Sequence, residues 1–204
     1  MVLEAIVCTI NAAGQPNFAP IGVHVAGSRV RLWLYSGSHT YANLHLNRQG
    51  VICFSDDVLL FVETALFSSC PPHVPSVKVL PPTLAAVGAV WEFSVADFDD
   101  TSEPALILAE VVYTRAGDSR FNGFCRAKMA VLEAAIAATR WQLAPAQLVT
   151  CWHHWSAIVG KTGGRQELQA FDRIAAFLNS KGVVLPAAAA EYSQGSRATA
   201  DRSC

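Results

Sequence analysis

The chain has 204 residues, of which 52% are hydrophobic and 15% are charged, and its formal net charge at pH 7 is −1. This length suits one domain of moderate size, or one domain with a substantial extension. The balanced charge argues against partners that need a basic surface, namely nucleic acid and anionic membranes. No apolar run reaches the ~18 residues of a membrane span, and so few charges predict that a second copy of the chain covers some apolar surface.

The cysteines and the N-terminus indicate a reduced, cytoplasmic protein. None of the six cysteines forms a CxxC pair, and several lie in apolar runs, as buried free thiols usually do. The first residues, Met1 to Glu4, contain no basic segment of the kind that begins a secretory signal. The six cysteines are Cys8, Cys53, Cys70, Cys125, Cys151 and Cys204.

The first half of the chain predicts a β-rich core. Strands are predicted over residues 4–10, where the alternation is imperfect, over 17–25 after turn residues at 11–16, and over 29–35, where the alternation has a period of two. Pro20 and Gly22 interrupt the second strand, which indicates an edge, a bulge or a place where a ligand approaches the backbone.

A short helix and three further strands complete this core. A helix is predicted from Thr40 to Gln49–Gly50, with the glycine as its stop signal. A buried strand follows at 51–54, then a helix capped near Asp56 and Asp57. Residues 68–82 contain five prolines and predict an irregular excursion before strands at 86–96 and 105–115. Six strands with antiparallel neighbours suit a closed barrel, and the fold class is mainly β with α.

The second half of the chain predicts three helices, over residues 126–141, 146–160 and 167–179. The predicted apolar faces are Met129, Leu132, Ile136 and Thr139 on the first helix, Leu148, Trp152, Trp155 and Val159 on the second, and Leu168, Phe171, Ala175 and Leu178 on the third. We therefore divide the chain into a barrel core at 1–118, a helical region packed on it at 119–186, and a flexible tail at 187–204.

Five short motifs invite other interpretations. Gly160-Lys161-Thr162 lacks the earlier glycine of a phosphate loop, because Trp155 stands in its place. His153 and His154 adjoin Cys151, but neighbouring helical residues point about 100° apart, so no metal site is predicted.

Three further motifs have both structural and functional interpretations. Ser38-His39 lacks the nucleophile elbow of a hydrolase. Asp56-Asp57 is either an acid–base pair or a helix cap, and the cap is favoured. Arg126 and Lys128 open a helix and either reach a phosphate or stay solvated.

The segment from Leu32 to Leu44 carries the central hypothesis. A strand ends at Gly37, and Ser38 and Thr40 place hydroxyls at a predicted helix start. Unpaired amides and the positive end of the helix dipole at such a start can hold a phosphate. The alternative interpretation is a capped helix with no ligand.

Several short motifs together resemble one family. They are Ala19-Pro20-Ile21-Gly22-Val23, Tyr35 to Leu44, Ser55-Asp56-Asp57, and Ala130 to Ala134 with Thr139-Arg140. In this order and spacing the chain resembles an uncharacterised FMN-binding split-barrel family, found mainly in methanogenic archaea and in bacteria with methanopterin-type C1 metabolism. The wider group includes flavin reductases and pyridoxamine-phosphate oxidases.

The resemblance implies a six-stranded antiparallel split barrel with a helical C-terminal region, and a homodimer with FMN at or near its interface. It places Ser38, Thr40 and Asn43 around the FMN phosphate and neighbouring oxygens. It also implies that Pro20, Ile21, Gly22 and Val23 lie along the isoalloxazine ring, with Tyr41 and Asp56 as further cofactor-binding residues. The segment Asn122 to Arg126 departs from the family pattern, which leaves Arg126 without an assigned role.

The expected function is that of an FMN-dependent oxidoreductase acting on a small nicotinamide or pterin-like molecule, since the flavin supplies hydride or electron transfer. No residue declares itself as a general acid or base, so no catalytic residue is predicted. A non-catalytic FMN-binding or storage protein and a cofactor-free dimeric interaction module are the two alternatives.

Overall fold

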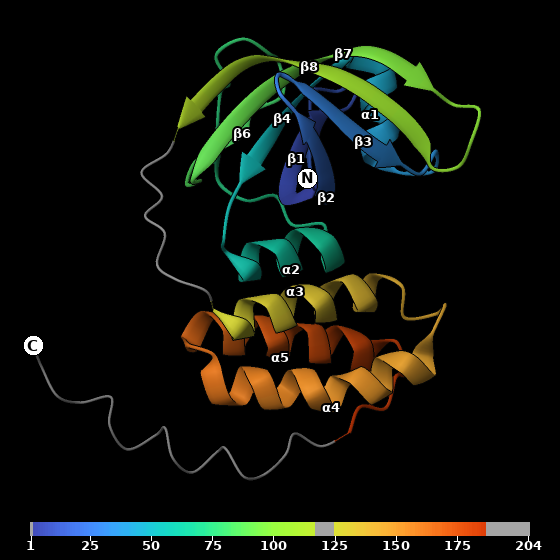
Figure 1. The fold of residues 1–204 in the computed structure, drawn as a ribbon, viewed down its shortest axis with the longest axis vertical. Helices are drawn as coiled ribbons and strands as arrows, with labels where there is room; N and C mark the ends of the chain where they lie inside the picture. Colours follow the sequence, from blue (N-terminus) through green and yellow to red (C-terminus); the bar gives the residue numbers. More distant parts are fainter. Residues whose placement is uncertain (1, 117–124, 187–204) are drawn as a thin grey trace, which may run out of the picture. The chain divides into compact units, whose positions relative to one another are not determined.

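The computed structural model of the protein describes residues 2–116 and 125–186. Six antiparallel strands close into a barrel in the order β1-β2-β3-β8-β7-β4 (Figure 1). Their bounds are β1 Val2–Ile10, β2 Pro16–Ala26, β3 Arg29–Leu34, β4 Gln49–Phe54, β7 Ala89–Asp99 and β8 Ala105–Ala116. The predicted six-stranded barrel is confirmed. The predicted tail at 187–204 and residues Asn122 to Phe124 lie outside the described residues.

Alternation along the strands fills the barrel with branched apolar side chains. In β3 the side chains of Val30, Leu32 and Leu34 are buried, whereas the residues between them are exposed. Facing positions of β1 and β8, such as Val7 and Ile107, join the same core and are fully buried. Because the interior is packed with side chains, a ligand-binding site in this unit has to lie on the outer surface or at strand edges.

The helix α1, His39–Asn47, ends earlier than the sequence predicts. Arg48 takes the left-handed conformation (φ 52°) that caps this helix, and its backbone N–H donates to the Leu44 carbonyl. The expected stop at Gln49–Gly50 is therefore wrong, because both residues belong to β4. Gly50 serves packing instead, since the ring of Phe93 occupies the space of a side chain.

The irregular excursion predicted at 68–82 contains one short strand, β5 (His73–Val74), which pairs with β6 (Thr83–Leu84). A buried carboxylate holds the segment to β7. Glu92 is 1% exposed and accepts backbone N–H groups from Val77 at 2.8 Å, from Lys78 at 2.6 Å and from Val79 at 3.2 Å.

We expect Glu92→Gln to lower the free energy of unfolding by about 2 kcal/mol, because an amide offers one acceptor oxygen and turns its NH₂ group toward a backbone donor. Urea denaturation measures this value. Glu110→Gln is the matched control, since the Glu110 carboxylate is exposed and lies 3.8 Å from Arg29 at the surface. Equal stabilities of the two variants would contradict the anchoring role of Glu92.

Two cysteines are buried in neighbouring strands, Cys8 in β1 and Cys53 in β4. Burial raises the pKa of the Cys53 thiol, and burial, followed by the nearby thiols Cys53 and Cys70, raises the pKa of Cys8 far above its usual range. Only the thiolate is a good nucleophile. Iodoacetamide at pH 8 is expected to alkylate exposed Cys70 in the native protein and to leave Cys8 and Cys53 unmodified until urea is added. Peptide mass spectrometry reads the three sites, and native alkylation of Cys8 would contradict this packing.

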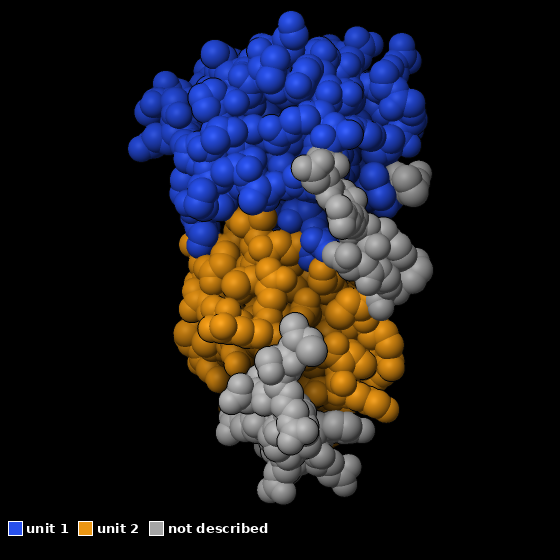
Figure 2. Space-filling view, turned by 90° about the vertical axis from the view of Figure 1, so that its left-hand side faces the viewer, with its two compact units in different colours: residues 1–56, 68–121 blue, residues 57–67, 122–204 orange. Residues whose placement is uncertain are grey.

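Contacts divide the chain into two compact units, residues 1–56 with 68–121 and residues 57–67 with 122–204 (Figure 2). The second unit consists of α2 (Val58–Leu66), α3 (Arg126–Thr139), α4 (Pro145–Thr162) and α5 (Arg165–Ser180). Thus α2 clusters with the C-terminal helices, although the sequence division counts it within residues 1–118. Within the described residues, no helix is both long and apolar enough to cross a membrane.

Alanine, rather than the larger residues, forms the buried face of α3. Met129 is 58% exposed and Thr139 is also exposed, so the predicted face is wrong. Its buried residues are Ala127, Ala130, Val131, Ala134, Ala135 and Ala138. Small side chains let α3 approach α2, α4 and α5 closely.

The other predicted faces are closer to the structure. Leu148, Trp152 and Val159 of α4 are buried, and Trp155 is half-buried. On α5, Phe171 and Leu178 are buried as predicted, whereas Leu168 is 43% exposed and the fully buried Ile174 was not predicted. A bidentate contact links α5 to α2, since Arg173 donates to both Glu63 carboxylate oxygens, at 2.7 and 3.3 Å.

Candidate functional site

The turn between β3 and α1 forms the candidate site in the barrel unit. Ser38 is the N-cap of α1, and its Oγ accepts the Tyr41 backbone N–H at 3.2 Å. The Ser38 N–H donates to the Tyr35 carbonyl at 2.9 Å and closes the turn. Glu103, from the loop between β7 and β8, accepts the Ser36 N–H at 2.8 Å and fixes the start of the turn.

Several backbone donors at this turn are unpaired. In the part of the chain that the structure describes, the N–H groups of Gly37, His39 and Thr40 have no hydrogen-bond acceptor. A Cβ built on Gly37 meets no atom within 4 Å, so the space beside the turn is open. Unpaired amides at the positive end of a helix dipole favour an anion, and a phosphate group fits this donor set.

Thr40 and Asn43 face inward and fix α1 to the barrel. The Thr40 Oγ1 accepts the Asn17 side-chain amide at 3.1 Å, which leaves the Thr40 hydroxyl hydrogen available for donation. The Asn43 amide donates to Thr9 Oγ1 at 3.0 Å. Thr40 and Asn43 are 3% and 7% exposed. Ser38, Thr40 and Asn43 thus all lie within the N-cap and first turns of α1.

The segment Pro20 to Val23 lies on an open edge of β2. β2 pairs with β1 from Pro16 to His24, in a register without shifts, but pairs with β3 only from His24 to Ala26. Of the three interpretations of Pro20 and Gly22, the edge is confirmed and the bulge is wrong. Val23 points into the core and is fully buried. Here only the backbone of Val23 can meet a ligand.

The remaining predicted site residues lie around this region or beyond it. Tyr41 is on α1, where burial, followed by a hydrogen bond to Asp100, raises the pKa of its phenol. Asp56 is exposed and follows β4. Asp57 is the cap of α2 and accepts the Leu60 N–H at 3.0 Å, which confirms the helix-cap interpretation of this pair.

Some residues around the turn between β3 and α1 were not predicted from the sequence. Asn17, Glu103 and Thr9 act through partners far away in the sequence, and no local pattern marks them. The His45 ring stacks on Phe98 with centroids 4.1 Å apart, and its Nε2 lies 3.3 Å from Asp100 Oδ2.

The basic and metal-ligand candidates of the second half lie in the helical unit. Arg126 is exposed and Lys128 is half-buried in the first turn of α3. His153 and His154 are exposed on α4. Among the described residues, no group of three or more His, Cys, Asp or Glu side chains is placed to hold a metal ion.

Comparisons with known proteins place the chain in a family. The model of the N-terminal domain of the protein of unknown function DUF447 matches residues 3–116, and a second DUF447 model matches residues 125–176. A search of the curated proteins found no match.

Two solved structures illustrate the likeness. An FMN-bound DUF447 protein from Methanosarcina mazei is 26% identical, with a TM-score of 0.77, over 87% of this chain and 95% of that one. An FMN-binding protein from Thermus thermophilus with bound p-hydroxybenzaldehyde is 17% identical, with a TM-score of 0.50, over 56% of this chain and 71% of that one. The second likeness shows the fold alone. On the family models, which together span both halves, the chain belongs to the DUF447 family.

Proposed function

We propose that this protein binds FMN in its barrel unit and acts as an oxidoreductase on a small nicotinamide or pterin-like molecule. The observation that carries the proposal is the set of unpaired amides of Gly37, His39 and Thr40 at the start of α1, where an anion is favoured. The DUF447 relative from Methanosarcina mazei, similar over 87% of this chain, is FMN-bound.

The residues of the barrel unit fit both ends of FMN. The free amides and the hydroxyls of Ser38 and Thr40 would hold the phosphate, with Asn43 behind them. The open edge of β2 at Pro20 to Val23 offers backbone groups for the polar edge of the ring system. Tyr41 and Asp56 are assigned to the same site on the family resemblance alone. Once bound, FMN supplies hydride or electron transfer.

Absorbance spectroscopy of the purified protein tests this function. We expect flavin bands, and release of the bound molecule should identify FMN rather than riboflavin or FAD. Apoprotein that fails to bind added FMN would contradict the proposal. Reduction by NADH or NADPH with turnover of an acceptor separates an oxidoreductase from a storage protein, because the latter binds FMN without turnover.

We also propose a cytoplasmic homodimer with FMN near its interface. Apolar side chains lie on the outer faces of adjacent strands. Val2 pairs across strands with His24, whose ring lies 4.3 Å from that of Trp33, and Trp33 in turn pairs with Leu106. Val2 is 49% exposed and Trp33 is 39% exposed. Two exposed apolar side chains on one outer face, with half-buried His24 between them, favour burial against a second copy.

Trp33→Glu is expected to shift a dimer to a monomer in sedimentation equilibrium, because it places a carboxylate in the apolar row. Tyr35→Glu is the control, since Tyr35 is 61% exposed and lies beyond the end of β3. A monomeric parent protein, or a Trp33→Glu variant that stays dimeric, would contradict this interface.

A further inference from the structure

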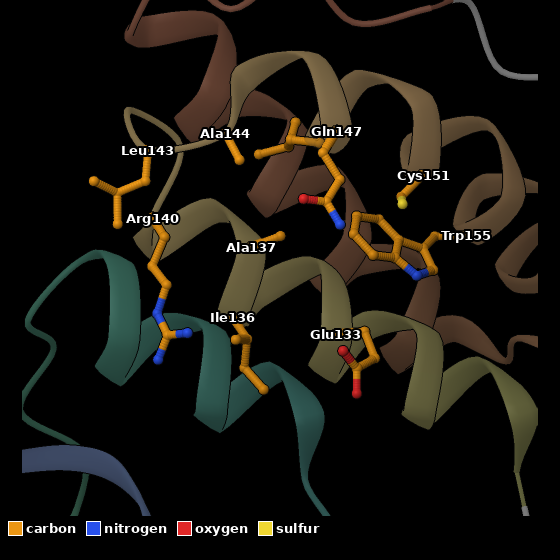
Figure 3. Close-up of a pocket in the computed structure, with 10 residues that line it drawn as sticks. Glu133, Ile136, Ala137, Arg140, Leu143, Ala144, Gln147, Cys151 and Trp155 are labelled. Carbon is orange, nitrogen blue, oxygen red and sulfur yellow. The ribbon is translucent and has the colours of Figure 1, made fainter.

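A pocket opens between α3 and α4, within the helical unit, and none of the residues that line it is assigned to FMN. Its volume is about 250 Å³. Figure 3 shows Arg140, Ile136 and Glu133 one after another along the α3 side of the pocket, and Gln147, Cys151 and Trp155 on α4. Pockets that bind small molecules run from about 300 to 1,000 Å³. This volume therefore favours a molecule with a single ring over a nucleotide.

Two opposite charges lie at the two ends of this row, Glu133 on α3 and Arg140 at the C-cap of α3. Glu133 and Arg140 are seven residues apart, which is two helical turns or about 10 Å along the axis. Among the described residues, neither side chain has an ion-pair or hydrogen-bond partner. Each charge is thus available to a ligand, and together they are complementary to a molecule with a cationic end and an anionic end.

The surface between the charges is apolar and partly aromatic. Ile136 and Ala137 line the α3 side, and the half-buried indole of Trp155 forms part of the α4 wall. An indole face packs well against a flat ring. The Gln147 amide, which points toward α3 in Figure 3, adds one donor group and one acceptor group.

We propose that this pocket binds a small linear zwitterion. Its cationic end pairs with Glu133, its anionic end pairs with Arg140, and its apolar or aromatic body packs against Trp155. Guanidinium groups bind carboxylates in a bidentate fork, which makes a carboxylate the favoured anionic end. This inference concerns the helical unit and does not depend on FMN.

Calorimetry on the full chain tests the site with 4-(aminomethyl)benzoate as the probe. Benzylamine and 4-methylbenzoate each keep the ring and one of the two charges. We expect the zwitterion to bind, and each single-charge analogue to bind about tenfold more weakly, because one charge-assisted contact is lost. Equal affinities of the three compounds, or no binding of the zwitterion, would overturn the proposal.

Two charge-removing variants assign the ends. Glu133→Gln is expected to weaken binding of the zwitterion about tenfold and to leave that of 4-methylbenzoate unchanged. Arg140→Gln is expected to weaken the zwitterion similarly and to leave benzylamine unchanged. Both side chains are exposed, so the fold should tolerate the changes. Arg165→Gln, an exposed change on α5, is the control and should alter neither affinity.

The Cys151 thiol reports directly on the pocket, because it lines the wall and is half-buried. A saturating concentration of 4-(aminomethyl)benzoate is expected to slow iodoacetamide alkylation of Cys151 at least about threefold. Cys70 in the barrel unit is the internal control and should react at an unchanged rate. Binding without protection of Cys151 would place the probe elsewhere and overturn the site. Cys151 that is already unreactive without the probe, in a protein to which the probe does not bind, would show that the protein's own side chains fill the pocket. That result would also overturn the proposed site.

Discussion

A Gly50→Ala variant is expected to lose about 3 kcal/mol of unfolding free energy, which is a large change for one methyl group. Gly50 lies in β4 and pairs with Phe93 of β7, and a Cβ added at Gly50 would lie 2.7 Å from the Phe93 Cε1 atom. Phe93 is fully buried in the barrel core, so its ring has little room to move away. Urea denaturation of the variant and the parent protein measures the loss.

Phe93→Leu provides the test of this cause. A double-mutant cycle compares the cost of Gly50→Ala in the parent protein with its cost in the Phe93→Leu background. If the ring causes the strain, the cost should fall to less than about half, because a smaller side chain leaves room for the methyl group. An unchanged cost would instead assign the loss to the backbone of β4.

Part of the barrel could be predicted because a strand such as β3 carries its own pattern. Alternation in residues 29–34 marks which side chains face inward, and this pattern depends on nothing distant in the chain. The same holds for the Ser38 cap, since a hydroxyl at a helix start interacts with residues three positions later. Local rules thus place the strands, the turn and the start of α1 from the sequence alone.

Features that depend on distant partners could not be predicted. The glycine at position 50 looks like a helix stop, and only the register of β4 against β7 shows that it makes room for Phe93. The buried face of α3 was missed because alanines score weakly in an apolar pattern, whereas close helix packing selects them. Asn17 and Glu103 likewise reach the site across 23 and 67 residues of sequence.

His39→Pro is expected to weaken FMN binding about tenfold, or by about 1.5 kcal/mol, relative to His39→Ala. Proline removes one backbone N–H, and His39 is the first residue of α1, where proline fits the helix. Ser38 before it is already extended, with φ −85° and ψ 147°, as a residue before proline prefers. The two variants share the loss of the imidazole, so their difference isolates the amide.

Riboflavin provides the decisive comparison, because it lacks the phosphate but keeps the ring system. If the amides at the start of α1 hold the phosphate, His39→Pro and His39→Ala should bind riboflavin equally and differ only toward FMN. Equal FMN affinities would exclude the His39 amide from the site, even in a protein that binds FMN. Equal losses for FMN and riboflavin would mean that proline has disturbed the fold of the turn, which thermal unfolding of the two apoproteins would show independently.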